Sequence, residues 1–233
     1  MNHALPSRPD VIRDFPRVDP SLVAEASQFP SSILADVAGR RGTLSSRIAP
    51  LSPSMRIAGP ALTIEVRPGD NLMIHAAMAL AQPGDVLVID GKGDETCALM
   101  GEIMVSQCMA IGIAGVIING AVRDTEAIRE LGFPMYAAGA NPNGPTKLVP
   151  GRLNWPISVA GAVVNPGDLI VADADGVVVI ERDKAASLMA LAKQKVADET
   201  ARIKGIRNGE RLRPLWLDGA LRKAGVLAEG ETL

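Results

Sequence analysis

Two short apolar runs, one on each side of a predicted helix, constrain the fold of this chain more than any other feature. Val86–Ile89 and Gly115–Ile118 are uninterrupted by charge, which is typical of strands buried on both faces. The residues between them predict a loop at 91–94 and a helix from Thr96 to Ile111. Strand, helix and strand in this order require a crossover connection, so the sequence predicts an α/β fold.

Further patterns predict the remaining elements and the organisation of the chain. Strands are expected at 57–66, 135–138, 157–164, 169–172 and 177–180, and helices at 21–27, 33–38, 72–81, 125–131 and 183–204. We interpret residues 1–30 as a proline-punctuated N-terminal arm, 31–204 as one α/β domain and 205–233 as a C-terminal tail. Apolar residues such as Leu215 and Trp216 on the tail indicate either an oligomer contact or packing on its own domain.

One segment occurs twice in nearly the same form. Residues 83–90 read PGDVLVID and residues 166–173 read PGDLIVAD. Two copies at this distance predict that one device, a turn leading into a buried strand, is used twice in the sheet.

Charge and composition exclude several classes of function. The net charge is −2 over 233 residues and no block of like charges is present, so nucleic acid and membrane surfaces are not expected partners. No stretch approaches the roughly 18 apolar residues of a membrane span, and the first 20 residues lack a signal-peptide core, so we expect a soluble, cytoplasmic protein. His3, His75, Cys97 and Cys108 have no zinc-ligand spacing, so any metal would be held by oxygen. Both cysteines fall in the pattern predicted to be helical.

Arg123 and Asp124 are the first candidates for a functional site. They follow the strand that is expected to end at Asn119-Gly120, and ligands of open α/β sheets collect beyond the carboxyl ends of strands. The guanidinium fits a carboxylate bidentately, and the aspartate offers oxygen to a hard cation. In the alternative interpretation, Asp124 is the N-cap of the next helix and Arg123 forms a surface ion pair.

Gly101 and Glu102 precede that pair by about twenty residues. Glycine inside a helix is destabilising by roughly 1 kcal/mol relative to alanine, so either a ligand approaches the backbone closely or the helix begins near Gly101. In the second case the free amides of Ile103 and Met104 point towards Arg123 and are able to hold an anion. The alternative for Glu102 is an exposed helical carboxylate.

Three further positions have competing interpretations. Glu199 continues the apolar stripe of the long C-terminal helix, so it either faces protein or pairs in solvent with Lys195 or Arg202. His75 lies among apolar residues, which favours a structural role. The glycines at 91 and 93 lack the third glycine of a dinucleotide-binding loop, because Thr96 stands in its place.

Four segments together resemble the class II pyruvate aldolases, the 4-hydroxy-4-methyl-2-oxoglutarate / 4-carboxy-4-hydroxy-2-oxoadipate aldolases. This family shares its fold with the regulator of ribonuclease activity A proteins. The segments are PGDVLVIDG at 83–91, MGEIM at 100–104, GVIINGAVRD at 115–124 and PGDLIVADADGVVVI at 166–180. The resemblance covers about residues 30 to 200.

The resemblance implies an α/β/β/α-type sandwich related to the swivelling phosphohistidine domain, assembled as a homotrimer or homohexamer with active sites between subunits. It implies that Asp124 is the ligand of Mg²⁺ or Mn²⁺ and that Arg123 binds pyruvate. The pyruvate carboxylate then lies on the amides that follow Gly101 and Glu102, those of Ile103 and Met104. Glu199 falls near a carboxylate that reaches in from the neighbouring subunit.

The chain departs from the family at position 102, where the family usually carries Asp. Glu102 is one methylene longer, which affects how it orients a water molecule and favours a shift in substrate range.

The implied activity is metal-dependent cleavage of a 4-hydroxy-2-oxo di- or tricarboxylic acid to pyruvate and a second oxo acid, with oxaloacetate decarboxylation as a secondary activity. The alternative is a non-catalytic regulator that binds a ribonuclease or another protein partner.

Overall fold

The computed structural model describes residues 10–210 and 212–233, so part of the N-terminal arm, with His3, lies outside the described residues. The helices are α1 Pro20–Ala26, α2 Ser31–Val37, α3 Leu72–Met78, α4 Glu102–Ile111, α5 Thr125–Leu131, α6 Ala185–Arg207 and α7 Leu217–Lys223, with a 3₁₀ turn at Arg182–Lys184. The strands are β1 Ala49–Pro50, β2 Ile57–Glu65, β3 Val86–Met100, β4 Gly115–Val122, β5 Met135–Ala140, β6 Arg152–Leu153, β7 Ile157–Val159, β8 Ala162–Val164, β9 Leu169–Asp173 and β10 Gly176–Ile180. The chain up to Ala192 forms one compact unit and Lys193–Leu233 forms another.

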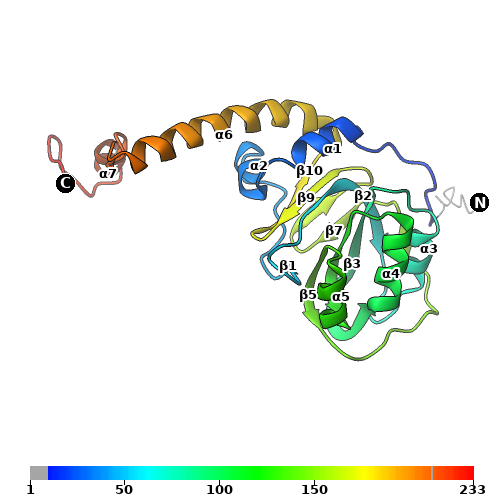
Figure 1. Cartoon of the computed structure of the whole chain (residues 1–233). Coiled ribbons are helices and arrows are strands. Elements are labelled where there is room, and N and C mark those ends of the chain that lie inside the picture. The colour runs from blue at the N-terminus through cyan, green and yellow to red at the C-terminus, as the bar shows by residue number, and fades with distance from the viewer. Residues whose placement is uncertain (1–9, 211) are drawn as a thin grey trace, which may run out of the picture. The chain divides into compact units, whose positions relative to one another are not determined.

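A large sheet organises the first unit and confirms the predicted α/β class (Figure 1). Its strand order is β1-β5-β4-β3-β2-β9-β10, with β6 paired to β2. Strands β2, β3, β4 and β5 are parallel, as the predicted crossover requires, whereas β1, β9 and β10 are antiparallel to their neighbours. The relation to the swivelling phosphohistidine domain stays a prediction.

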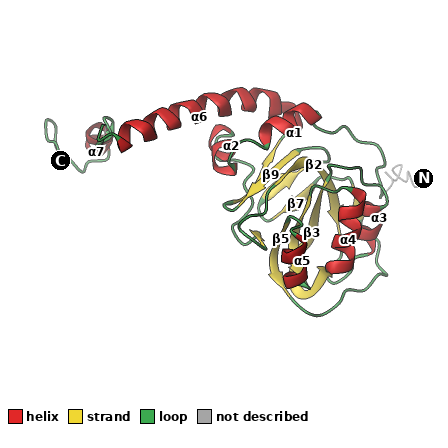
Figure 2. Ribbon diagram, in the orientation of Figure 1, coloured by secondary structure: helices red, strands yellow, loops and turns green. Residues whose placement is uncertain are grey.

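Both faces of the parallel strands are buried, which explains their uninterrupted apolar sequences. Helices α3, α4 and α5 lie over one face (Figure 2). The core on this face includes Leu87, Ile89 and Ile118. On the other face strands β7 to β10 contribute to a second core with Val88 and Ile117. Helix α2 packs against β9 and β10. No helix among the described residues is long and apolar enough to cross a membrane.

The prediction for residues 91–111 is wrong in its first half. Strand β3 continues to Met100, and α4 begins only at Glu102, so Cys97 lies in a strand and Cys108 in the helix. Pairing with β4 shifts register three times along this stretch, between Ile89 and Met100. The local sequence resembles a loop and a helix, but contacts with distant segments override it.

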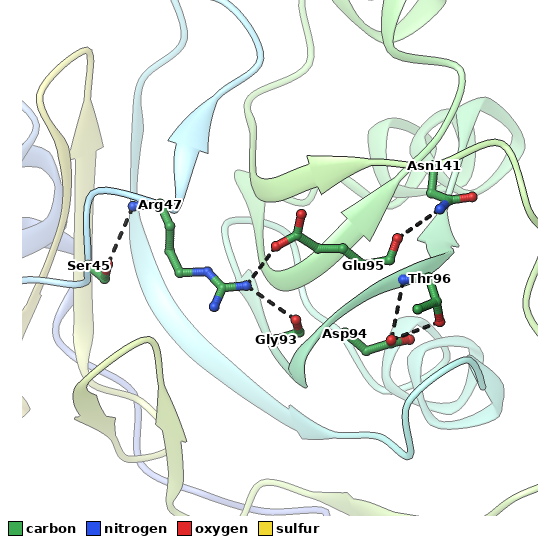
Figure 3. A network of polar contacts seen from close by, with 7 residues as sticks. All are labelled: Ser45, Arg47, Gly93, Asp94, Glu95, Thr96 and Asn141. Atoms are coloured by element: carbon green, nitrogen blue, oxygen red, sulfur yellow. Dashed lines mark hydrogen bonds and ion pairs between the residues drawn. The ribbon is translucent and has the colours of Figure 1, made fainter.

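Those contacts are polar and come from both sides of the strand (Figure 3). Arg47 donates to the carbonyl of Gly93 at 3.2 Å and to the carboxylate of Glu95 at 2.9 Å. Asn141 donates to the carbonyl of Glu95 at 2.8 Å. Within the strand itself, the hydroxyl of Thr96 donates to Asp94 at 2.8 Å. The irregular strand is therefore tied to the segments before β1 and after β5.

The other predicted elements are largely confirmed, with three corrections. Strand β4 continues through Asn119 and Gly120 to Val122, because a register shift against β5 accommodates them. Residues 157–164 form a two-stranded hairpin, β7 and β8, with Gly161 in the turn at φ 94°. Helix α3 ends at Met78, and the carboxylate of Asp70 accepts a hydrogen bond from the Leu72 amide near its start.

The repeated Pro-Gly-Asp segment forms the same turn twice, as predicted. Asp85 accepts a hydrogen bond from the amide of Gln82 at 2.9 Å, and Asp168 accepts one from the amide of Asn165 at 2.9 Å. The preceding glycines have φ of 91° and 82°. Each buried carboxylate thus closes a turn whose glycine adopts the left-handed region, and β3 or β9 follows.

The two glycines of these turns give a matched test. At Gly84 an added Cβ meets open space, whereas at Gly167 it would overlap the carbonyl oxygen of Pro16. We expect Gly84→Ala to destabilise by about 1–2 kcal/mol through the backbone conformation alone. Gly167→Ala should cost at least about 1 kcal/mol more because of the overlap. Urea unfolding of both variants checks this, and equal losses would show that the segment at Pro16 moves aside freely.

Candidate active site

Two chain segments meet where β3 and β4 end. Met100 pairs with Val122 in the sheet, and the amide of Arg123 donates to the carbonyl of Met100 at 3.0 Å. Gly101 then stands at the N-cap position of α4, and Asp124 stands at the N-cap position of α5. Both segments therefore leave the sheet at the same edge, beyond the carboxyl ends of parallel strands.

The carboxylate of Asp124 joins these segments. Its Oδ2 accepts a hydrogen bond from the amide of Glu102 at 3.1 Å and lies 3.5 Å from Nε of Arg123. Asp124 has φ of 57°, and its side chain forms no cap hydrogen bond to α5. The capping interpretation is therefore wrong for the side chain, whereas the predicted ion pair of Arg123 is present with Asp124 as its partner.

Gly101 is required by close approach and not by its backbone angles. Its φ of −150° suits any residue, but an added Cβ would overlap Oδ2 of Asp124 and come within 2.9 Å of Cγ of Arg123. Of the two explanations for this glycine, the later helix start is confirmed. The group that approaches the backbone closely is a side chain of this chain.

A cavity of about 220 Å³ opens beside this junction. Its lining residues are Asn71, His75, Leu99, Met100, Gly101, Ile103, Met104, Arg123, Gly144, Pro145 and Lys147. The amides of Ile103 and Met104 lie in the first turn of α4, where no carbonyl four residues earlier belongs to the helix. The positive end of the helix dipole and the guanidinium of Arg123 therefore make this cavity suited to an anion. Glu102 is exposed beside it.

Asp124 fits a hydrated divalent cation of the Mg²⁺ or Mn²⁺ type. Its side chain is 41% exposed, and no described residue donates a hydrogen bond to Oδ1, which leaves that oxygen open to a ligand. Such ions use one or two carboxylates and keep several waters. Within the described residues no group of three or more histidine, cysteine or acidic side chains gathers around one point, so a fully protein-coordinated ion does not fit.

Glu199 is the one predicted site residue that belongs to the second compact unit. It lies on α6, where its carboxylate is 3.2 Å from Nζ of Lys195, the partner named in the alternative interpretation. The tail carries exposed apolar side chains: Leu215 is 98% exposed and Trp216 is 63% exposed.

Three cavity residues with polar side chains are missing from the set that the sequence predicts: Asn71, His75 and Lys147. Oδ1 of Asn71 and Nε2 of His75 are buried without a hydrogen-bond partner. Burial lowers the pKa of His75, and the nearby Lys147 lowers it further, which keeps the imidazole neutral at neutral pH. A polar side chain within the apolar pattern of α3 was the only signal for His75, and Lys147 had none.

The chain is similar to known proteins in sequence and in fold. A family model described as "Aldolase/RraA" matches residues 21–179. The chain is 40% identical over 185 residues to a Halalkalibacterium halodurans protein named "Putative 4-hydroxy-4-methyl-2-oxoglutarate aldolase", covering 79% of this chain and 88% of that protein.

Two solved structures have similar folds. An uncharacterized protein from Pseudomonas syringae pv. tomato has a TM-score of 0.76 at 26% identity and covers 84% of this chain and 93% of its own. Streptomyces coelicolor RraAS2, described as an unusual member of the RNase ES inhibitor RraA protein family, has a TM-score of 0.74 at 29% identity, covering 81% of this chain and 99% of its own.

The close approach at Gly101 predicts the effect of adding one methyl group. In Gly101→Ala the carboxylate of Asp124 and the side chain of Arg123 must move, while the backbone is unstrained. We expect the melting temperature to fall by less than about 4 °C. Affinity for Mn²⁺, measured by titration calorimetry, should fall at least about tenfold. Gly219→Ala is the control, since its Cβ meets open space; unchanged Mn²⁺ affinity in Gly101→Ala would contradict the role of this glycine.

Proposed function

The chain belongs to the Aldolase/RraA family, and from this membership we propose that it is a metal-dependent carbon–carbon lyase. Its proposed substrate is a 4-hydroxy-2-oxo di- or tricarboxylic acid, which it cleaves to pyruvate and a second oxo acid. Oxaloacetate decarboxylation is the proposed secondary activity, because loss of the β-carboxylate leaves the same enolate. The observation that carries this proposal is the Asp124 carboxylate held on the Glu102 amide, beside Arg123 and the cavity.

The proposed division of labour follows from the groups at the cavity. The amides of Ile103 and Met104 bind the carboxylate of the 2-oxo acid through the N-terminus of α4. Arg123 donates to the oxygen at C2, where negative charge develops as the C3–C4 bond breaks, and this charge stabilisation favours cleavage. The electron pair of that bond forms the enolate of pyruvate, which takes up a proton from water at C3, and C4 becomes the carbonyl of the second product.

Glu102 stands where a proton acceptor is needed. Its side chain is exposed at the first position of α4, next to the cavity. In our proposal it hydrogen-bonds the water molecule that receives the proton of the C4 hydroxyl, as general base catalysis requires. Asp124 would hold Mg²⁺ or Mn²⁺, and a bound ion supplies Lewis acidity towards the 2-oxo group.

We also propose that the protein assembles as a homotrimer or homohexamer with its sites between subunits. The side chain of Ile103, which lines the cavity, is 75% exposed, and large exposed apolar groups beside a cavity are typical of surfaces that a partner covers. Leu215 and Trp216 on the tail are exposed as well. In this proposal Glu199 of one subunit reaches the site of its neighbour.

A second candidate function is a regulator that binds a ribonuclease without catalysis. It is supported by the similarity to Streptomyces coelicolor RraAS2, whose family is described as RNase ES inhibitors. Only the lyase function requires the carboxylates of Asp124 and Glu102, because a protein that only binds a partner needs no carboxylate at the cavity. Pyruvate release from 4-hydroxy-4-methyl-2-oxoglutarate and oxaloacetate, with EDTA or with added Mg²⁺ or Mn²⁺, distinguishes them.

Asp124→Asn is the variant that tests the metal ligand. Asparagine tolerates the left-handed backbone at this position and still accepts the Glu102 hydrogen bond, but it lacks the charge. We expect turnover to fall at least about 100-fold, or roughly 3 kcal/mol of barrier, with a change in melting temperature below about 4 °C. Near-normal pyruvate release with normal metal dependence would remove Asp124 from the reaction.

The departure at position 102 is tested by two substitutions. Glu102→Gln keeps the shape and loses the base, so turnover should fall at least about tenfold. Glu102→Asp restores the residue usual in the family and should retain or raise turnover. Steady-state kinetics on both substrates check this, and indistinguishable Gln and Asp variants would mean that Glu102 has no part in the chemistry.

A further inference from the structure

The cavity has a second set of polar groups that the proposed chemistry does not use. Arg123 and the amides of α4 serve the 2-oxo acid end of the substrate, whereas Asn71 and His75 come from the start of α3, and Lys147 comes from the loop after β5. A volume of about 220 Å³ corresponds to roughly seven water molecules at about 30 Å³ each. Pyruvate has six non-hydrogen atoms, and bonded atoms pack more closely than waters, so pyruvate alone does not fill the cavity that Lys147 lines.

The positive charge of Lys147 is not balanced by a carboxylate of the described residues. In residues 10–210 and 212–233, no carboxylate forms an ion pair with Lys147, and no acidic side chain lines the cavity. Arg123, the other cation of the lining, is partnered by Asp124. An uncompensated ammonium in a concave site attracts an anionic group of a ligand.

His75 offers a hydrogen-bonding atom to the same region. Its Nε2 is buried and has no partner among the described residues, which is unfavourable unless a ligand or water satisfies it. The imidazole lines the same cavity as Lys147, whose ammonium lowers its pKa. The two side chains are therefore placed to act on one ligand group.

A buried carboxylate holds the residues beside Lys147 in place. Oδ2 of Asp70 accepts hydrogen bonds from the hydroxyl of Thr146 at 2.6 Å and from the amides of Leu148 at 2.7 Å and Val149 at 3.1 Å. Burial alone would raise the pKa of Asp70, but these hydrogen bonds and one from Leu72 lower it to about 2. The loop on each side of Lys147 is thus anchored to an ionised group, which fixes the backbone from which the lysine extends.

We propose that Lys147 and His75 bind the second carboxylate of the substrate, the one that leaves with the departing oxo acid. This inference rests on the proposed lyase function and names the side chains that recognise the second carboxylate of its substrate. The ammonium of Lys147 donates to the carboxylate, and Nε2 of His75 donates to it as the neutral imidazole. Arg123 and α4 hold one end of the substrate and Lys147 holds the other, so the C3–C4 bond lies between two anion sites.

Two stable ligands isolate this contact without turnover. 2-Oxoglutarate carries both carboxylates but has no C4 hydroxyl and cannot undergo the cleavage, whereas 2-oxopentanoate replaces the distal carboxylate with a methyl group. With Mg²⁺ present, wild type should bind 2-oxoglutarate at least about tenfold more tightly, as a hydrogen bond between charged groups implies. Titration calorimetry gives the ratio of the two dissociation constants.

Substitutions of Lys147 test whether this residue causes the preference for 2-oxoglutarate over 2-oxopentanoate. Lys147→Met should reduce the preference to less than about threefold, and Lys147→Arg, which keeps the charge, should retain most of it. Lys184→Met is the matched control, because Lys184 pairs with Glu181 and does not line the cavity; it should keep the wild-type ratio. Equal affinity of wild type for the two ligands, or an unchanged ratio in Lys147→Met, would overturn the inference.

Kinetics separate this inference from the proposed function. If wild type cleaves 4-hydroxy-4-methyl-2-oxoglutarate, Lys147→Met should lower kcat/KM for it at least about tenfold more than for 4-hydroxy-2-oxopentanoate, which lacks the distal carboxylate. Equal losses on both substrates would leave the lyase function standing and overturn the role of Lys147. If wild type cleaves neither substrate but the binding ratio depends on Lys147, the lyase proposal fails and the carboxylate site stands.

Discussion

The hydrogen bond from the Glu102 amide to the Asp124 carboxylate is the interaction on which the candidate site depends. It joins the first residue of α4 to the residue that precedes α5, so two helices begin at a fixed distance from each other. The carboxylate lies at the N-terminal end of α4 and 3.5 Å from Nε of Arg123, so its negative charge meets positive charge from both segments. Asp124 keeps a left-handed backbone that is unusual outside glycine, because these contacts hold it there.

Much of the fold is predictable because its signals are local. The strands β2, β4 and β9 lie within uninterrupted or alternating apolar runs, and the Pro-Gly-Asp turns carry their own closing carboxylates. The second half of β3 is not predictable in this way. Its course depends on Arg47 and Asn141, which are distant in sequence, and the register shifts against β4 leave no periodic pattern to detect.

The site likewise contains residues that local sequence signals predict and one that depends on contacts between distant segments. Arg123, Asp124 and Gly101 are predictable, since two of them follow a strand and the third is a glycine without a helical explanation. Lys147 is not predictable, because its position comes from the hydrogen bonds that Asp70 accepts from the residues beside it. Such contacts between a turn before α3 and a loop after β5 have no signature in either segment alone.

The position of β2 has a consequence for how the chain reaches its native state. One side of this strand pairs with β3 soon after it in sequence, but its other side is completed only by β6 and β9, with Ile57 opposite Ala172. Contacts this far apart in sequence form slowly, because a long loop must close before they stabilise the chain. During synthesis on the ribosome, β2 therefore remains an open apolar edge until β9 has emerged, and this interval is when self-association competes most strongly with folding.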